Sequence, residues 1–460
     1  MIAAKLRKLL WTIALSGAAT AGVSQEATTE LQTQAEAALV NGNPLRAAQL
    51  SMGILEANPD DFAALFIVAL AQSDLGEDAL AATIAERAYN VAREDQSQFQ
   101  AARLVASTRF SMGQYVRAEF WLRRAANHAK TEQDVQTVAS EYRAANRANP
   151  LTLQFTASVA PSNNINDGSE DGVLNFETIG LSVLLPEDQL ALSGIEFAGS
   201  ARLNYRISEH DRQRTSLTGL LSGETYRLSQ EAKEILASSP NEDVRAVEGT
   251  DFSTLLAEVG ITHQRSGLSP LGPVSLSLNF GTYWEGPERL VNYQDLIVQH
   301  SIPIDDNDIF LIRASVRDQQ ALKSTLVDSM TYDLIGSYNR TLASGDQLSL
   351  SLGWRQSEAG FENTYFEYRT GINYALNQPV FGARLSTSFE IGYRTYDTFA
   401  TTLDGRDDQF VTAQTDAIFE QMSYFGFSPS MSISATRTES TAEENTSSAV
   451  QVLFGIESNF

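Results

Sequence analysis

The histidines are the side chains best suited to acid–base catalysis or metal binding in this 460-residue sequence. There are four of them, His128, His210, His263 and His300. No two stand at the short spacing by which a helix or a turn presents two ligands to one metal ion. The sequence therefore predicts no histidine-based metal site and no catalytic histidine pair.

Two acidic stretches offer oxygen ligands instead. PIDDND contains Asp305, Asp306 and Asp308, and LDGRDD lies further along the chain. Such carboxylates can bind Ca²⁺, but aspartate is also favoured in turns, where it accepts hydrogen bonds from nearby backbone. We favour the turn interpretation. Since the sequence has no nucleophile elbow, phosphate-binding loop or HExxH motif, we expect neither an enzyme nor a cofactor.

Composition excludes further classes of chemistry. The sequence has no cysteine, which excludes disulfides, thiolate metal sites and thiol nucleophiles. Its formal net charge is −24, and no run of lysine and arginine follows the first few residues. Because nucleic-acid backbones are bound by clustered positive charge, we expect no nucleic-acid partner.

Residues 1–21 have the pattern of a secretory signal peptide. Lys5, Arg7 and Lys8 precede the apolar stretch LLWTIALSGAATAGV, and the tripeptide ATA at 19–21 fits a cleavage site. An N-terminal membrane anchor is the alternative, but the stretch is short and rich in small residues for a bilayer span. We therefore expect an exported chain without a transmembrane helix.

Residues 27–148 are rich in alanine and poor in proline, which favours helices. Three glycines are each followed by alanine five residues later, and consecutive glycines are 34 and 37 positions apart. The positions are Gly42 and Ala47, Gly76 and Ala81, Gly113 and Ala118, with Tyr115 after the third glycine and Pro59 after the first unit. Glycine permits the turn, and alanine lets two helices approach closely. The pattern resembles about three tetratricopeptide repeats, a short α-solenoid with a concave face; an alanine-rich bundle is the alternative.

From Leu151 onward the hydrophobic period changes to two, which indicates strands with one apolar face. VSLSLNFGTYW, YFEYRTGINYAL and FGARLSTSFEIGY all show this alternation. Aromatic residues gather at strand ends, as they do at membrane interfaces. Residues 151–460 are therefore expected to form an antiparallel transmembrane β-barrel of about 14 strands.

The connections between the expected strands alternate in length. Even-numbered connections such as SGLSPLG and LASGDQ are short and rich in turn residues, whereas odd-numbered ones are longer and more charged. If residues 27–148 lie in the periplasm, the first strand runs outward and the odd connections are extracellular, as in outer-membrane barrels. The expected odd connections are roughly 160–192, 229–250, 285–292, 318–329, 357–363, 396–409 and 438–448.

The chain ends on VQVLFGIESNF, where Phe454, Ile456 and Phe460 share the apolar side of a two-faced strand. A last strand that pairs with the first closes a barrel and leaves no edge unpaired in lipid. The terminal aromatic resembles the signal by which outer-membrane barrels are recognised for insertion. We therefore expect the barrel-assembly machinery and outer-membrane lipid as partners.

Two short motifs resemble a known family. APSNNINDG contains Pro161, Asn163, Asn164 and Asn166, and SYFGFSPSMSISATR contains Phe425, Gly426, Phe427, Pro429 and Arg437. With the order of the two domains, they resemble the surface lipoprotein assembly modifier family over essentially the whole mature chain. The chain departs from the family pattern at Ser440, which Thr441 follows instead of asparagine, and in its last strand, which holds fewer basic residues than the family's.

The resemblance implies an outer-membrane translocator that delivers specific client proteins to the cell surface. Such clients are lipoproteins or soluble binding proteins, often ones that capture iron or haem, and the periplasmic repeats would engage the client or a chaperone. A polysaccharide-export porin and a passive channel remain alternatives. A carbohydrate-lined lumen predicts inward aromatics and carboxylates, whereas most tyrosines and phenylalanines here lie on the expected lipid-facing side of the strands.

Overall fold

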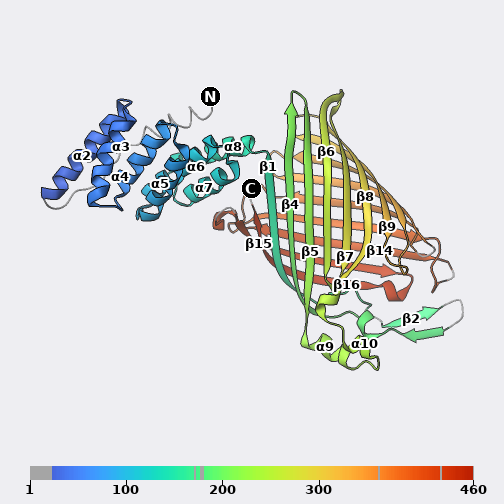
Figure 1. Ribbon diagram of the computed structural model, residues 1–460. Coiled ribbons are helices and arrows are strands. Elements are labelled where there is room, and N and C mark those ends of the chain that lie inside the picture. The colour runs from blue at the N-terminus through green and yellow to red at the C-terminus, as the bar shows by residue number, and fades with distance from the viewer. Residues whose placement is uncertain are drawn as a thin grey trace. The chain divides into compact units, whose positions relative to one another are not determined.

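The computed structural model describes residues 23–169, 172–176, 181–360, 363–402, 404–424 and 427–458. The chain divides after Pro150 into a helical unit and a β unit, each compact by itself (Figure 1). The expected signal peptide, the motif residues Phe425 and Gly426, and the terminal Phe460 lie outside the described residues.

The described part of the helical unit forms seven helices, and each packs against the next along the chain (Figure 1). They are α2 (Val23–Val40), α3 (Pro44–Ala57), α4 (Phe62–Asp74), α5 (Asp78–Val91), α6 (Asp95–Ser111), α7 (Tyr115–Asn127) and α8 (Glu132–Ala148). Side-chain caps fix several starts: Asp61 accepts the Ala64 N–H at α4, and Thr131 and Asp134 form a capping box at α8. No helix in the described ranges is long and apolar enough to cross a membrane.

Glycine and alanine recur at equivalent places in three helix pairs. The glycines lie in the turns before α3, α5 and α7 with left-handed backbone, which favours glycine because it lacks Cβ; they are Gly42, Gly76 and Gly113, with φ of 71°, 84° and 71°. The alanines, fully buried in the helices that follow, are Ala47, Ala81 and Ala118. The predicted tetratricopeptide-like arrangement is therefore confirmed.

Two further repeat positions stabilise turns. The Tyr115 ring at the start of α7 packs edge-on against Phe110 of α6, with centroids 5.4 Å apart. Pro59 lies between α3 and α4, and its carbonyl accepts a hydrogen bond from Arg87 at 2.7 Å. These contacts connect a helix end to the neighbouring helix and limit fraying there.

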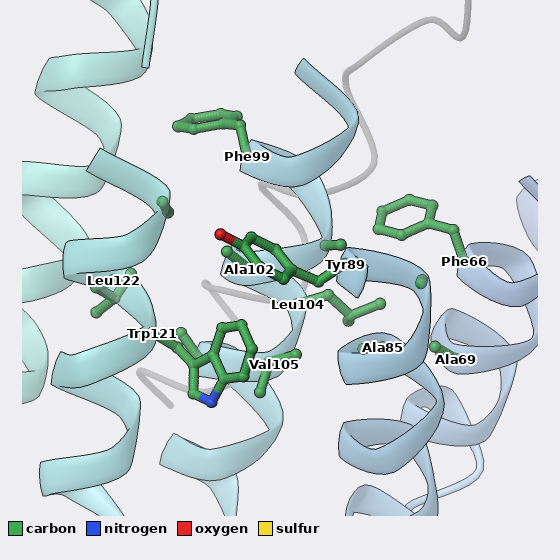
Figure 2. Close-up of a cluster of buried hydrophobic side chains, with 14 of the residues drawn as sticks. Phe66, Ala69, Ala85, Tyr89, Phe99, Ala102, Leu104, Val105, Trp121 and Leu122 are labelled. Carbon is green, nitrogen blue, oxygen red and sulfur yellow. The ribbon is translucent and has the colours of Figure 1, made fainter. Parts of the chain in front are cut away.

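The core of the helical unit joins α4 to α8, and Figure 2 shows much of it. Phe99 and Leu104 of α6 are almost fully buried, and each such side chain stabilises the fold by about 1.5–3 kcal/mol. Tyr89 of α5 meets Trp121 of α7 edge to face, with ring centroids 5.2 Å apart. Small neighbours such as Ala102 leave room for these rings.

The β unit is a closed antiparallel barrel of fourteen strands (Figure 1). They are β1 (Leu151–Ser162), β4 (Gly194–His210), β5 (Gln213–Leu228), β6 (Thr254–Ser269), β7 (Gly272–Glu285), β8 (Glu288–Pro303), β9 (Asp308–Ala321), β10 (Ser329–Thr341), β11 (Gln347–Glu358), β12 (Tyr365–Ala375), β13 (Arg384–Tyr396), β14 (Arg406–Ile418), β15 (Phe427–Ser440) and β16 (Ser447–Ser458). β16 pairs with β1, so the predicted strand number and closure are confirmed.

The connections at one end of the barrel, the long-loop end, carry structure of their own. The 163–193 connection holds a two-stranded sheet of β2 (Val173–Phe176) and β3 (Leu181–Leu184), which the sequence did not predict. Ile165 of this connection packs with Ala232 of α9 (Gln230–Ala237) in a small apolar core, so the first two long connections fold together.

One expected long connection is wrong. β7 and β8 extend to a two-residue turn at 286–287, instead of ending at an eight-residue loop over 285–292. Gly286 has φ of 51°, and this backbone allows the tight turn between antiparallel strands. At the opposite, short-turn end, two-residue turns at 211–212 and 270–271 match the expected short connections.

The outer face of the barrel is apolar. Leu276, Leu278 and Phe280 of β7 point outward and are exposed, as are Leu350 and Leu352 of β11. Contiguous exposed apolar surface of this extent is stable in lipid and not in water. Because closure also leaves no unpaired edge, the β unit is a membrane-spanning barrel of the outer-membrane type.

Candidate functional site

The inner wall of the barrel carries a cluster of paired charged side chains. It lies towards the long-loop end, where arginines and carboxylates on β8 to β14 face inward in a row. We call this row the charge belt: Asp295, Arg317, Asp333, Arg355, Glu367, Arg369, Arg394, Arg406 and Asp408.

The first pair of the charge belt is bidentate. Arg317 donates from Nε and Nη2 to the two carboxylate oxygens of Asp295, both at 2.7 Å. The Tyr293 ring lies under the same guanidinium, 4.2 Å from its Cζ, and the Tyr293 hydroxyl donates to Glu258 at 2.7 Å. Two-point pairing and ring stacking hold Arg317 in one orientation against the wall.

Further along the belt, carboxylates are shared between arginines. Asp333 accepts from Arg355 Nε at 2.9 Å and from Arg369 Nη2 at 2.7 Å. Glu367, whose side chain is almost fully buried, accepts from Arg369 Nη1 at 2.8 Å and from Arg394 at 2.6 Å. Sharing links β10 to β13 by side chains as well as by the backbone ladder, which stiffens this part of the wall.

Aromatic rings support the other end of the belt. The Arg406 guanidinium lies 4.0 Å from the Tyr396 ring centre and pairs with Asp408 at 2.9 Å. Arg394 lies 4.8 Å from the centre of Tyr365. These tyrosines point inward, so the expectation that aromatics face mainly outward does not hold for the long-loop end of the lumen.

β15 presents a different inner face. Every second residue from Ser428 to Ser440 is serine or threonine, and this set pairs with the inward residues of β14. Ser432 Oγ donates to Asp416 at 2.5 Å, and Thr412 and Thr436 are linked at 3.3 Å. The lumen wall therefore changes from ionic on β8–β14 to hydroxyl-rich on β15.

The closing seam between β1 and β16 is the least paired junction of the described barrel. It has five paired positions, between Thr156 and Ser162, whereas every other pair of neighbouring barrel strands has eleven or more. The register omits Ala160 and Pro161, and proline has no N–H to donate. Just before the paired stretch, the Phe155 N–H donates to the side-chain oxygen of Ser458 at 2.7 Å. Among the described residues, the seam therefore has the fewest paired backbone positions.

The asparagines of the first motif lie at the long-loop end of this seam. Asn163 Oδ1 accepts the backbone N–H of Val450 on β16 at 3.2 Å, so a side chain continues the pairing beyond Pro161. The Asn164 side chain is buried and bonds both the N–H and the carbonyl of Gly168, each at 2.9 Å. Together they fix where β1 ends and its connection begins.

Asn166 closes the first long connection on itself. Its Nδ2 donates to the carbonyls of Asp188 and Leu190 at 2.9 and 2.8 Å, and its Oδ1 accepts the Leu192 N–H at 2.9 Å. A carboxylate could not make this set because it has no donor. The contacts explain why asparagine suits these positions; a role in transport stays a prediction.

The residues of the second motif that the structure describes lie on β15, next to the seam strand. Pro429 stands opposite Ile456 of β16, and its carbonyl accepts the Phe419 N–H at 2.9 Å. Arg437 faces outward and pairs with Glu439 at 3.0 Å on an exposed surface. Phe427 begins β15. Phe454 and Ile456, for which the sequence predicted an insertion signal, point outward on β16 and are exposed.

The histidines and acidic stretches form no metal site in the described residues, where no group of three or more potential ligands converges. His263 bonds Thr215 at 2.9 Å, and His128 bonds Asp95 at 2.9 Å in the helical unit. Asp305 accepts the backbone N–H of Asp308 at 2.9 Å, as the turn interpretation of this stretch requires.

Charged side chains are also buried in the helical unit. Arg103 of α6 and Glu141 of α8 form an ion pair, with Arg103 Nε 2.9 Å from Glu141 Oε2. Glu119 of α7 is buried and accepts from Asn149 at 3.1 Å; burial raises the pKa of Glu119, and the Asn149 bond partly offsets this. At the surface, hydrogen bonds from His128 and Lys130 lower the pKa of Asp95.

Comparison with known proteins gives matches of fold only. No family model and no curated protein sequence matches the chain. Among solved structures, the match to Acinetobacter baumannii OccAB4 covers 67% of this chain and 98% of the OccAB4 chain, with 10% identity and a TM-score of 0.34. The match to the first TPR domain of human RPAP3 covers 26% of this chain and 91% of that domain, with 16% identity and a TM-score of 0.24. The match to the Yersinia enterocolitica type III secretion translocator chaperone SycD covers 27% of this chain and 88% of the SycD chain, with 15% identity and a TM-score of 0.26.

Sequence reasoning missed the charge belt and the short seam. The belt had a signal: arginine and carboxylate residues recur on the polar side of strands whose other side is apolar, as in YFEYRTG. The seam had a weaker one, Pro161 within the first strand. Neither signal shows by itself which strands become neighbours.

Proposed function

We propose that the chain is an outer-membrane translocator that delivers specific client proteins across the outer membrane. The clients would be surface lipoproteins or secreted soluble binding proteins, including ones that capture iron or haem. The observation that carries the proposal is the combination, in one chain, of tetratricopeptide-like repeats and a fourteen-stranded barrel whose motif asparagines lie at a weakly paired seam.

The repeats would act in the periplasm, where they engage the client or its chaperone. Helical-repeat solenoids present extended surfaces that suit peptide and protein partners. Because repeats and barrel are covalently joined, a client bound to the repeats is at raised effective concentration near the barrel. The barrel-assembly machinery is the partner proposed for insertion, with Phe454, Ile456 and Phe460 as its signal.

The route that this geometry favours is an opening of the β1–β16 seam. A fourteen-stranded lumen is too narrow for a folded domain, and a lipid anchor needs a path from the lumen to the bilayer. Backbone bonds contribute roughly 0.5–1.5 kcal/mol each, so a junction with five paired positions opens more readily than one with eleven.

Protease shaving of intact cells tests delivery itself. The substrate is the small exported protein encoded beside this gene, and cells with and without the chain are compared. We expect its surface exposure to disappear on deletion, and to return with the full chain but not with the barrel alone. Unchanged exposure after deletion would rule the proposal out.

Engineered disulfides test the seam route without background, because the chain has no cysteine of its own. Ala157→Cys with Ile456→Cys joins paired positions across the seam, and Ala413→Cys with Ala435→Cys joins paired positions between β14 and β15 as a control. Oxidation should block delivery only in the seam variant, and reduction should restore it. Delivery through an oxidised seam would show that the client uses the lumen.

A passive outer-membrane channel is the second candidate, favoured by the ionic and hydroxyl-bearing inner wall. A polysaccharide-export porin shares this architecture, and the inward tyrosines Tyr365 and Tyr396 are the residues it would use. Steady conductance of the purified protein in planar bilayers, together with unchanged client exposure, would favour the channel. Loss of surface glycan on deletion would favour the porin.

A further inference from the structure

We propose that a recess in the inner wall of the barrel binds carboxylate groups of a polyvalent anion. The recess has a volume of about 420 Å³ and lies between β8 and β12, beside the charge belt. It goes beyond the proposed function, because it concerns a ligand held by the lumen wall whichever route a client takes. Its charged lining consists of Arg313, Arg317, Arg355, Arg369, Asp295 and Asp333.

The recess offers guanidinium donors that the wall does not use. Arg313 is exposed, and the described residues include no ion pair or side-chain hydrogen bond to it. Arg317 commits Nε and Nη2 to Asp295, which leaves Nη1. Arg355 donates to Asp333 from Nε, and its nearest other carboxylate, Glu367, is 3.9 Å away. Donors from three side chains therefore converge on one space.

The charge of the recess favours an anion. Four arginines and two aspartates line it, an excess of two positive charges. Glu367, outside the lining, accepts from Arg369 and also from Arg394, so these two further charges leave the excess unchanged. The local sign is thus opposite to the net charge of −24 of the whole chain. A metal cation is disfavoured by the same arginines.

The shape of the donors favours carboxylate. Planar guanidinium groups bind carboxylates through two parallel N–H donors, and Arg317 already shows this geometry with Asp295. Hydroxyls of Ser315, Thr331 and Ser357 also line the recess and can donate to the remaining oxygens. Because separate arginines stand on β9 and β11, a ligand with two or more carboxylates would use the site fully.

Such carboxylates can come from a free organic acid or from glutamate and aspartate side chains of an extended peptide. Isothermal titration of the full chain in detergent tests both, with citrate and a tetraglutamate peptide as probes. We expect Arg313→Gln to weaken binding of the preferred probe about tenfold, since it removes charge-assisted bonds. Arg313→Lys should keep the positive charge but lose the two parallel N–H donors of the guanidinium group, so its affinity for the probe should be intermediate.

The matched control is Arg227→Gln, because Arg227 stands opposite the outward-facing Ile195, is exposed and lies away from the lumen. Its affinity for both probes should equal that of the wild type. Preference for citrate would identify a small-molecule site, and preference for tetraglutamate would identify an acidic peptide; both support the recess. Equal binding by wild type and Arg313→Gln, or no binding of either probe, would overturn the proposal. Neither titration result depends on client delivery. Failure of the recess proposal can therefore be told apart from failure of the translocator proposal.

Discussion

The two units of this chain place the same kind of ion pair in opposite surroundings. In the helical unit, Arg103 and Glu141 meet inside an apolar core, with side chains only 2% and 6% exposed. In the barrel, Arg317 and Asp295 meet at the inner wall, where the arginine side chain remains 43% exposed although the aspartate side chain is only 7% exposed. The first unit is apolar inside and polar outside, and the second has the reverse arrangement.

The difference shows that the surroundings of an ion pair decide its energetic role. A buried pair compensates for charges that have lost water, so removal of one partner leaves an uncompensated charge in the core. A pair at a water-accessible wall can regain hydration, so its loss costs little. In the barrel, stability comes from backbone pairing and lipid contact, and the luminal charges are available for function.

The largest expected effect is loss of the buried partner. Glu141→Ala should destabilise the helical unit by about 3–5 kcal/mol, because Arg103 stays buried without its carboxylate. Asp295→Ala in the barrel should cost about 1 kcal/mol or less, because water reaches Arg317. Denaturant unfolding of the full chain, followed by helical and by β circular dichroism signals, measures both.

A double variant is the control for this comparison. Arg103→Met with Glu141→Leu replaces the pair by apolar groups and should recover most of the stability lost in Glu141→Ala. If Asp295→Ala proves as costly as Glu141→Ala, the barrel pair is structural and the contrast between the two units fails.

The second effect concerns small residues. Ala118 of α7 is fully buried, so Ala118→Leu should overpack the core and cost about 1–3 kcal/mol. Ala314 of β9 is exposed on the outer face of the barrel, opposite Leu334, so Ala314→Leu should leave stability unchanged. Thermal unfolding of the two variants makes the comparison; equal losses would mean that the outer face is packed and not lipid-facing.

The smallest effect is a pH dependence confined to the helical unit. Burial raises the pKa of Glu119, so the folded state holds its proton more tightly than the unfolded state. Stability from this group is therefore present at low pH and falls as the pH rises from the ordinary glutamate pKa through the raised one. Glu119→Gln should remove that fall in a pH series of unfolding midpoints.

Asp95 gives the opposite sign in the same unit. Hydrogen bonds from His128 and Lys130 lower its pKa, so its contribution is present above the ordinary aspartate value and is lost as the pH falls through the lowered one. In the same pH series of unfolding midpoints, Asp95→Asn should remove only the loss of stability at acid pH. If both variants altered the same limb, the assignment of burial to one carboxylate and surface pairing to the other would be wrong.

Local patterns predicted most of the fold. The glycine–alanine spacing predicted the helix pairs, because a left-handed turn and a close helix contact each demand one residue type. The period of two predicted the strands and their outer face. The prediction of a long connection over 285–292 was wrong because the apolar alternation of β7 and β8 stops before their backbone pairing does. Gly286 then permits a tight turn between the two strands.

The sequence by itself determined the two kinds of structure, their order, the strand number and the face of each strand that meets lipid, because these follow from local period and turn chemistry. Only the tertiary structure decided which polar residues became neighbours. Asp333 is shared by arginines on β11 and β12, and Asn163 reaches Val450, 287 residues away along the chain. Strand register and barrel closure set these distances, and no local pattern encodes them.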